Sequence, residues 1–217
     1  MHQSKTREAI LRAAVELAAS QGISGTSMDA IAEAAGVAKG SLYYNFASKD
    51  AIFEELVHSG LHDLAEYLQR SRAQRRGGAA LAAMIYEMFG ILQRRPQLAK
   101  ILAAELFRTD RSWADSLTLL QRGIVEQFHE CLVEAWGDEA SADAPLTSIS
   151  ASGVFGMVLF AGIGWLRFSP DRTVEEATRA TLRTLAVPGV DRWHPDASSG
   201  APSGRNSDRA ADVAPRP

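Results

Sequence analysis

Apolar residues recur at every third or fourth position along almost the whole chain, which is the spacing that places them on one side of an α-helix. No segment shows the strict alternation of apolar and polar residues that is typical of a half-buried strand. The pattern therefore predicts an all-α protein. Helices are expected near residues 4–21, 27–36, 38–44, 48–71, 79–93, 97–108, 112–136, 146–168 and 173–186.

Residues with special roles at helix ends support these limits. Ser27 and Ser48 each precede a helical pattern and can cap the first free backbone N–H groups. Gly36 suits the left-handed backbone that ends many helices, and Pro96 suits a first helical position, where no N–H partner is needed. The order Thr-Val-Glu-Glu at residues 173–176 predicts a capping box.

Composition divides the chain into three parts. We expect an N-terminal three-helix domain over residues 1–50 and a larger helical domain over residues 51–187. The last part, residues 188–217, contains five of the chain's eight prolines together with many Ser, Ala and Gly residues. Such a composition does not bury enough apolar surface to fold, so we expect a disordered tail.

The spacing of three residues predicts a helix-turn-helix within residues 27–49. Two short helices that cross steeply need a small residue where they approach, a turn residue that tolerates positive φ, and an apolar anchor on the second helix. Ala32, Gly36 and Leu42 have these properties in this order. The first domain therefore has the arrangement that places a second, recognition helix in a DNA groove.

The surface of this second helix suits nucleic acid. No acidic residue occurs from Val37 to Lys49, and the same stretch contains two lysines, two tyrosines, two serines and an asparagine. These side chains can donate hydrogen bonds to base edges and phosphates, and Gly40 would let the backbone approach a base or sugar. The alternative is that Tyr43 and Tyr44 are core aromatics and that the lysines belong to a solvated face.

Residues 6–57 closely resemble the N-terminal DNA-binding domain of the tetracycline-repressor (TetR) family of bacterial regulators. The matching segments are AILRAAVELAASQGI and TSMDAIAEAAGVAKGSLYYNFASKDAIFEEL, and the run LYYNF-x-x-K is the most specific piece. The resemblance implies base and backbone contacts by Lys39, Gly40, Ser41 and Tyr43, and phosphate contacts by Ser27, Tyr44, Asn45 and Lys49. Asn45 stands where many members have His, and Asp29 stands where some have a basic residue.

The resemblance also implies a function. The chain would be a ligand-responsive, sequence-specific DNA-binding transcriptional regulator, a repressor that a small-molecule effector releases from double-stranded operator DNA. It would act in the cytoplasm as a homodimer, held by a bundle of the two C-terminal helices of each subunit. In the implied mechanism the effector displaces the helix at residues 48–71 and so changes the separation of the two recognition helices.

The helix expected at residues 146–168 is the candidate for the dimer contact, since residues 144–166 contain no charged side chain. Small residues there would allow close approach, and apolar residues would supply contact across a two-fold axis. The expected contact residues are Gly153, Val154, Gly156, Met157, Val158, Gly162, Ile163 and Gly164. The alternatives are an intramolecular core helix and a membrane span. We expect no membrane association, because the strongly apolar part is shorter than the roughly 20 residues that a span needs.

An effector pocket is expected among the helices between residues 79 and 168. Methionine and aromatic side chains form adaptable walls for an apolar or aromatic ligand. The candidate effector-binding residues are Met84, Met88, Phe89, Phe107, Trp113, Leu117 and Phe155. The alternative is that these residues are ordinary core, because such side chains at helical spacing are also typical of a packed interior.

Charge and motifs narrow the function classes further. The chain has 23 Lys and Arg against 26 Asp and Glu, and this net charge of −3 excludes a protein that coats nucleic acid indiscriminately. No phosphate loop, nucleophile motif or paired-carboxylate motif occurs, so we expect no enzyme, no catalytic residue and no cofactor.

His58 and His62 have a spacing that could hold a metal, but a solvated helix face is expected. Cys131, the one cysteine, is expected to be a small buried residue. A helical small-molecule-binding protein that does not act through DNA is the alternative function.

Overall fold

The computed structural model describes residues 2–105, 110, 114–137 and 144–190 of the chain. Within these residues the regular structure is helical throughout, so the predicted all-α class is confirmed. The helices are α1 (His2–Gly25), α2 (Met28–Ala35), α3 (Lys39–Asn45), α4 (Lys49–Arg72), α5 (Gly77–Arg94), α6 (Pro96–Glu105), α7 (Ala114–Trp136), α9 (Ala144–Phe168) and α10 (Val174–Leu182). Every helix that the apolar pattern predicts is present.

Caps and turns set the limits of the N-terminal helices. Ser27 accepts a hydrogen bond from the backbone N–H of Ala30 at 3.1 Å, and Gly36 ends α2 with a φ of 65°. Only glycine takes this left-handed backbone without strain, which allows the sharp turn into α3. Gly22 also has a positive φ, 75°, but the helix resumes as far as Gly25. α1 is therefore kinked at Gly22, where the sequence predicted its end.

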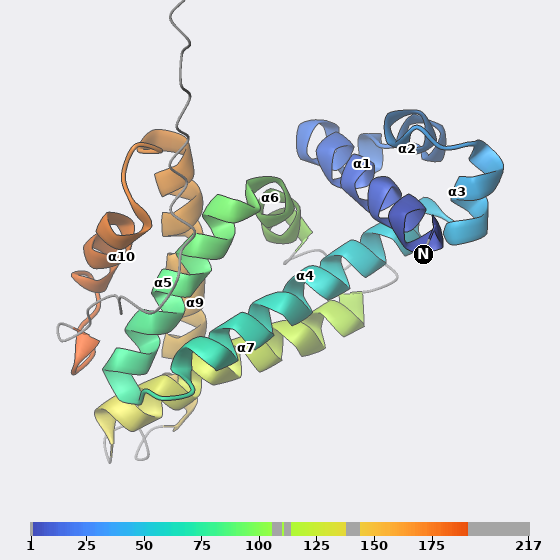
Figure 1. Ribbon diagram of the computed structural model, residues 1–217. Coiled ribbons are helices and arrows are strands. Elements are labelled where there is room, and N and C mark those ends of the chain that lie inside the picture. The colour runs from blue at the N-terminus through green and yellow to red at the C-terminus, as the bar shows by residue number, and fades with distance from the viewer. Residues whose placement is uncertain (1, 106–109, 111–113, 138–143, 191–217) are drawn as a thin grey trace, which may run out of the picture.

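The larger helical domain packs α4, α5, α7 and α9 around a common core, with α10 against α5 and α9 (Figure 1). Its centre consists of fully buried apolar side chains such as Leu68, Leu81 and Phe128. α4 and α7 lie side by side, and the N-terminal helices stand at one end of α4 (Figure 1). α6 is a second link between the two parts of the chain, because it packs on α1 as well as on α4.

The packed chain continues beyond the predicted start of the tail at residue 188. Val190 is only 8% exposed, and a side chain on Gly78 would lie 2.7 Å from the backbone nitrogen of Val190. Glycine at position 78 therefore lets this segment pack against the first turn of α5. Residues 191–217 lie outside the described residues, so disorder of the tail remains a prediction.

One side of α9 packs inside the subunit. Val154 and Val158 are 8% and 0% exposed, and a side chain on Gly162 would lie 3.2 Å from the ring of Phe89. The prediction that these three α9 positions contact a second subunit is therefore wrong, since α5 and α7 already cover that side. By length and composition alone Thr147–Phe168 could also cross a membrane, a weak indication that the core helix of a soluble protein gives as well.

Candidate functional site

The recognition helix α3 is held in place by a small core and one arginine. Leu42 is fully buried and Phe46 is 4% exposed, and both belong to the same core cluster as Ile10 of α1 and Ile31 of α2. The guanidinium of Arg7 lies 4.3 Å from the centre of the Phe46 ring and donates a 3.1 Å hydrogen bond to the backbone carbonyl of Asn45. Arg7 also pairs with Glu55 on α4, so α1, α3 and α4 meet at one side chain. These contacts fix the orientation of α3.

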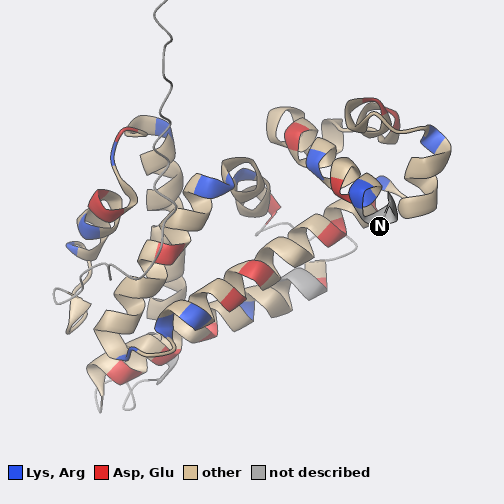
Figure 2. Ribbon diagram, in the orientation of Figure 1, with Lys and Arg blue, Asp and Glu red and all other residues tan. Residues whose placement is uncertain are grey.

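The opposite face of α3 is open. Tyr43 and Tyr44 are 53% and 77% exposed, which excludes the alternative that they are core aromatics. A side chain at Gly40 would meet no atom within 4 Å, so nothing in the described part of the chain covers the first turn of the helix. Figure 2 shows no acidic residue along the ribbon of α3 itself. The face is therefore accessible and rich in hydrogen-bond donors, and α3 itself contributes no acidic side chain to it.

Lys39, at the start of α3, already has an acidic partner. Its ammonium group donates a 2.8 Å hydrogen bond to the carboxylate of Asp29 on α2. This hydrogen bond, and after it the charge of Asp29, raises the pKa of Lys39 above its ordinary value. Both side chains are about two-thirds exposed, at 67% and 63%, so the pair is readily separated and Lys39 remains available to an anion such as DNA phosphate.

Three other predicted contact residues also make contacts within the chain. Lys49 donates a 3.0 Å hydrogen bond to the carbonyl of Ile23, and the amide of Asn45 donates one of 2.8 Å to the carbonyl of Ser41. Ser27 is occupied as the cap of α2. The structure thus brings the predicted residues to one region, on α3 and at the starts of α2 and α4. Their contacts with DNA remain predictions.

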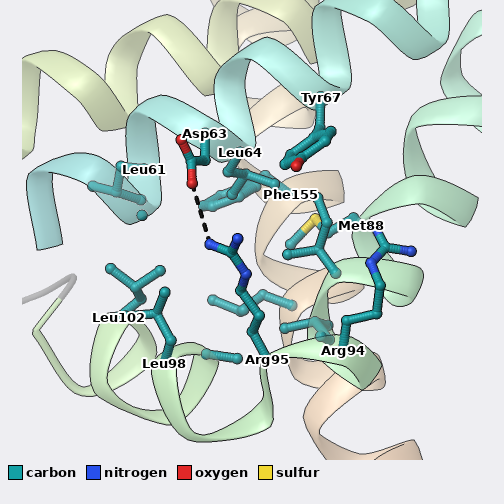
Figure 3. Close-up of a pocket in the computed structure, with 15 residues that line it drawn as sticks. Leu61, Asp63, Leu64, Tyr67, Met88, Arg94, Arg95, Leu98, Leu102 and Phe155 are labelled. Atoms are coloured by element: carbon teal, nitrogen blue, oxygen red, sulfur yellow. Dashed lines mark hydrogen bonds and ion pairs between the residues drawn. The ribbon is translucent and has the colours of Figure 1, made fainter. Parts of the chain in front are cut away.

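A second candidate site is a cavity of about 290 Å³ in the larger domain (Figure 3). This volume is at the small end of the range of about 300–1,000 Å³ typical of ligand sites. Four helices supply its walls. The lining residues are Gly60, Leu61, Asp63, Leu64 and Tyr67 of α4, Met88, Ile91, Leu92 and Arg94 of α5, Arg95 at the α5–α6 corner, Leu98, Ala99 and Leu102 of α6, and Phe155 and Leu159 of α9.

The structure separates the predicted effector-binding residues. Met88 and Phe155 line the cavity. Met84 is buried beside Cys131, with 3.6 Å between the two sulfur atoms, and the Phe89 ring packs 5.8 Å from that of Trp165. Neither belongs to the cavity lining. Phe107 and Trp113 lie outside the described residues, as does the side chain of Leu117 on α7.

Sequence reasoning missed the wall that α4 provides and, on α6, which the expected range included, it named none of the lining residues Leu98, Ala99 and Leu102. Gly60 on α4 lets α6 approach, because a side chain there would lie 3.3 Å from the methyl carbons of Leu98 and Leu102. Leucines at helical spacing are typical of any core, so nothing in the pattern distinguished these from filled positions. The adjacent arginines Arg94 and Arg95 were an available signal of a charged edge to the cavity, because they lie directly before Pro96 and so place two charges at a helix corner.

The histidine pair and the cysteine that the sequence analysis considered lie in ordinary structural environments. His62 lies 3.4 Å from Glu66 on an exposed face of α4, and in the described ranges no group of three metal-binding side chains converges. Cys131 is fully buried, as predicted, and its burial raises the pKa of the thiol to about 11.

The chain matches known regulators at both the sequence and the fold level. Residues 10–56 match the family model described as bacterial regulatory proteins, tetR family. The HTH-type transcriptional regulator RutR of Escherichia coli K12 is 27% identical over 180 residues, which are 83% of this chain and 82% of RutR. A TetR-family transcriptional regulator from Bordetella parapertussis has a similar structure, with 22% identity, a TM-score of 0.70 and coverage of 81% of this chain and 93% of that one.

A second solved structure is AibR in complex with isovaleryl coenzyme A and operator DNA. It is 22% identical, with a TM-score of 0.67, and covers 83% of this chain and 97% of its own. The family match falls on the helices that build the recognition surface, and the fold likeness extends through the helices that enclose the cavity. The resemblance to the tetR family of bacterial regulatory proteins that the sequence predicted is therefore confirmed, by the family model over residues 10–56 and by relatives such as RutR.

Proposed function

We propose that this transcriptional regulator is a cytoplasmic homodimeric repressor that binds operator DNA through α3 and leaves it when an effector fills the cavity. The observation that carries the proposal is the open, donor-rich face of α3, a helix without acidic residues that is held by the contacts of Leu42, Phe46 and Arg7. The protein is otherwise slightly acidic, with a net charge of −3. A local donor-rich surface on an acidic protein favours binding of a short, specific site over general attraction to phosphate.

Dimer formation is supported by the outer face of α9. Phe160 is 81% exposed and Ile149 is 67% exposed, and Gly153 and Gly156 lie between them with no atom within 4 Å of an added side chain. These positions follow steps of four, three and four residues, so they form one seam along the helix. An exposed apolar seam with glycines at its centre suits close packing against the same helix of a second copy. Two α3 helices could then reach major grooves about 34 Å apart.

The effector is proposed to act through α4 and α6. Leu98 and Leu102 of α6 face the cavity, while Ile101 and Glu105 line a small hollow against α1 at Ile23. A ligand that needs more room than the empty cavity offers would move α6, and with it α1 and the helix-turn-helix. α4 also lines the cavity, and its N-terminal end follows α3 directly, so a movement of α4 would reach the helix-turn-helix as well. The neighbour AibR was solved with an acyl-coenzyme A and operator DNA, which supports the same two binding partners here.

Gel-shift measurements on the DNA upstream of the protein's own coding sequence test the DNA-binding proposal. Lys39→Ala and Tyr43→Ala should each weaken specific binding by about tenfold to a hundredfold, since one good contact contributes about 1–3 kcal/mol. Arg70→Ala is the control, because Arg70 lies on an exposed face of α4 and pairs only with neighbouring groups on that helix. Unchanged specific retardation by both α3 variants would contradict the assigned site. Absence of any salt-dependent binding by the wild type would favour a binding protein that does not act through DNA.

Sedimentation measurements test the dimer. Phe160→Glu should convert the protein to monomers, because it buries a charge in the proposed seam. Leu119→Glu is the matched control, since Leu119 on α7 is also a large exposed apolar residue, at 67%. Equal effects of the two variants would contradict a contact through α9.

A further inference from the structure

We propose that the cavity binds an aliphatic molecule that ends in an anionic oxygen group, and that Arg95 holds this group after the ligand displaces Asp63. The inference rests on the proposed function and names the class of effector that it would take. Its basis is the distribution of apolar and charged side chains around the cavity, seen in Figure 3.

The interior of the cavity suits a flexible hydrocarbon chain. Its walls are mostly aliphatic, from four helices, and Tyr67 and Phe155 are the aromatic side chains that line it. A wall made mostly of leucines and a methionine adapts to a flexible hydrocarbon chain. The volume of about 290 Å³ limits the buried part of the ligand to a short or medium chain.

The charged residues of the lining are two arginines and one aspartate. Arg95 donates a 3.1 Å hydrogen bond to Asp63 across the cavity, from the α5–α6 corner to α4 (Figure 3). Arg94 lines the same cavity, and its partner Glu87, at 2.8 Å, does not. Each arginine thus has a carboxylate partner, and two guanidinium groups with one carboxylate line the cavity, so an anionic head group could exchange for a partner carboxylate, whereas a cationic one could not.

The position of Arg95 is fixed by the backbone, while its ion pair is weak. Pro96 begins α6 directly after Arg95 and restricts the conformation of the preceding residue, so the corner cannot extend into a continuous helix. Arg95 and Asp63 are 53% and 43% exposed, and ion pairs with this exposure contribute little to stability. The planar guanidinium binds carboxylate or phosphate with two parallel hydrogen bonds, so an anion anchored by a buried chain can compete with Asp63.

This exchange would also alter the link between α4 and α6. In the structure Arg95 joins the α5–α6 corner directly to Asp63 of α4. With an anion in its place, Arg95 would be joined to the ligand, and Asp63 would turn to solvent. α4 and α6 would then be connected through the ligand instead of through the Arg95–Asp63 pair. The effector would therefore bind with unequal affinity to the arrangement with the ion pair and the arrangement without it, and this difference can shift α1 and the helix-turn-helix.

Calorimetric titration with probes of one chain length tests the proposal. Octanoate and octyl phosphate provide the two anionic head groups, and 1-octanol and octylammonium provide neutral and cationic ones. We expect binding of at least one anion, with affinity about tenfold or more above that of 1-octanol, and weakest binding of octylammonium. The stronger of the two anions identifies the head group as carboxylate or phosphate.

Two variants of the ion pair give opposite expectations. Arg95→Gln should weaken anion binding about tenfold or more, whereas Asp63→Asn should strengthen it by up to about fivefold, because it removes the competing carboxylate. Binding of 1-octanol should change little in either variant. Arg179→Gln is the control, since it breaks a comparably exposed ion pair on α10, with Glu175, outside the cavity.

Several results would overturn the proposal. Weaker anion binding in both variants would show that the pair serves only to hold the helices together. Equal affinity for octanol and the anions, preference for octylammonium, or no binding of any probe would each exclude an anionic aliphatic ligand. Gel shifts on the same samples without probe report operator binding separately, so a failure of the repressor function is distinguishable from a failure of this ligand assignment.

Discussion

The proposed DNA-binding unit and the proposed ligand cavity place their candidate functional residues in opposite ways. In the first, the candidate contacts lie on one short stretch of chain, mostly on the outer face of α3, with a small core directly beneath. In the second, the walls come from α4, α5, α6 and α9, which are separated by as much as a hundred residues in sequence. One site is a surface pattern, and the other is a space that remains after four helices have packed.

This difference determines how each site responds to change. The face of α3 depends on which side chains are exposed, so single surface substitutions should alter DNA binding while the fold persists. The cavity depends on how closely the helices approach, so a change of packing at a distance can reshape it. The following predictions are designed to test this contrast, in order of decreasing effect.

Leucine truncation in the two cores should give similar losses of stability and different losses of function. Leu42 and Leu68 are both 0% exposed, and Leu42→Ala and Leu68→Ala should each lower the free energy of unfolding by about 2–5 kcal/mol. Only Leu42→Ala should abolish operator binding under conditions where the protein is still folded, because Leu42 anchors α3 whereas Leu68 lies on α4. Urea denaturation and gel shifts measure the two quantities. Equal loss of DNA binding in the two variants would show that the N-terminal helices and the larger helical domain do not behave as separate units.

Adding a methyl group to the two sides of α9 should have opposite effects. Gly162→Ala should destabilise the subunit by about 1–3 kcal/mol, because the new carbon would overlap Leu92 and press on Phe89. Gly156→Ala has free space around it in the subunit and should be neutral or stabilising by up to about 1 kcal/mol. The same variant should weaken the dimer if two α9 helices pack closely. Thermal melting at several protein concentrations separates the two effects.

Removal of the caps should cost less. Ser27 and Ser48 each accept a 3.1 Å hydrogen bond from a backbone N–H of the helix that follows. Ser27→Ala and Ser48→Ala should therefore each lower stability by about 1 kcal/mol in denaturation experiments. If Ser27 also contacts phosphate, only Ser27→Ala should weaken operator binding by more than this loss of stability explains.

The smallest effect is expected at the pair of Asp29 and Lys39. Asp29→Asn should strengthen operator binding a few-fold and steepen its dependence on salt by about one phosphate contact, because Lys39 no longer has a competing carboxylate. Asp29→Glu keeps the charge and is the control for the substitution itself. Weaker binding of Asp29→Asn, measured across a series of salt concentrations, would mean that Asp29 orients Lys39 for its contact.

Several features of the molecule follow from local sequence alone. Ser27, Gly36 and Leu42 act over a few residues, as a cap, a left-handed turn and a buried anchor, so their spacing predicted α2, the turn and α3 correctly. The capping box of Thr173 and Glu176 and the start of α6 at Pro96 are confirmed for the same reason. The family match also depends on this contiguous stretch, residues 10–56.

Tertiary structure decided which side of each apolar helix faces inward and where space remains. α9 is apolar around most of its circumference, so its pattern did not distinguish Val158, which is buried, from Phe160, which is exposed. In the same way Met84 and Met88 are one turn apart on α5, yet only Met88 reaches the cavity. The periodicity of apolar residues shows which side of a helix can pack, but long-range packing determines whether that side meets another helix, a cavity or solvent. For that reason the sequence determined the candidate DNA-binding helix of this protein, and only the packed structure located the candidate ligand cavity.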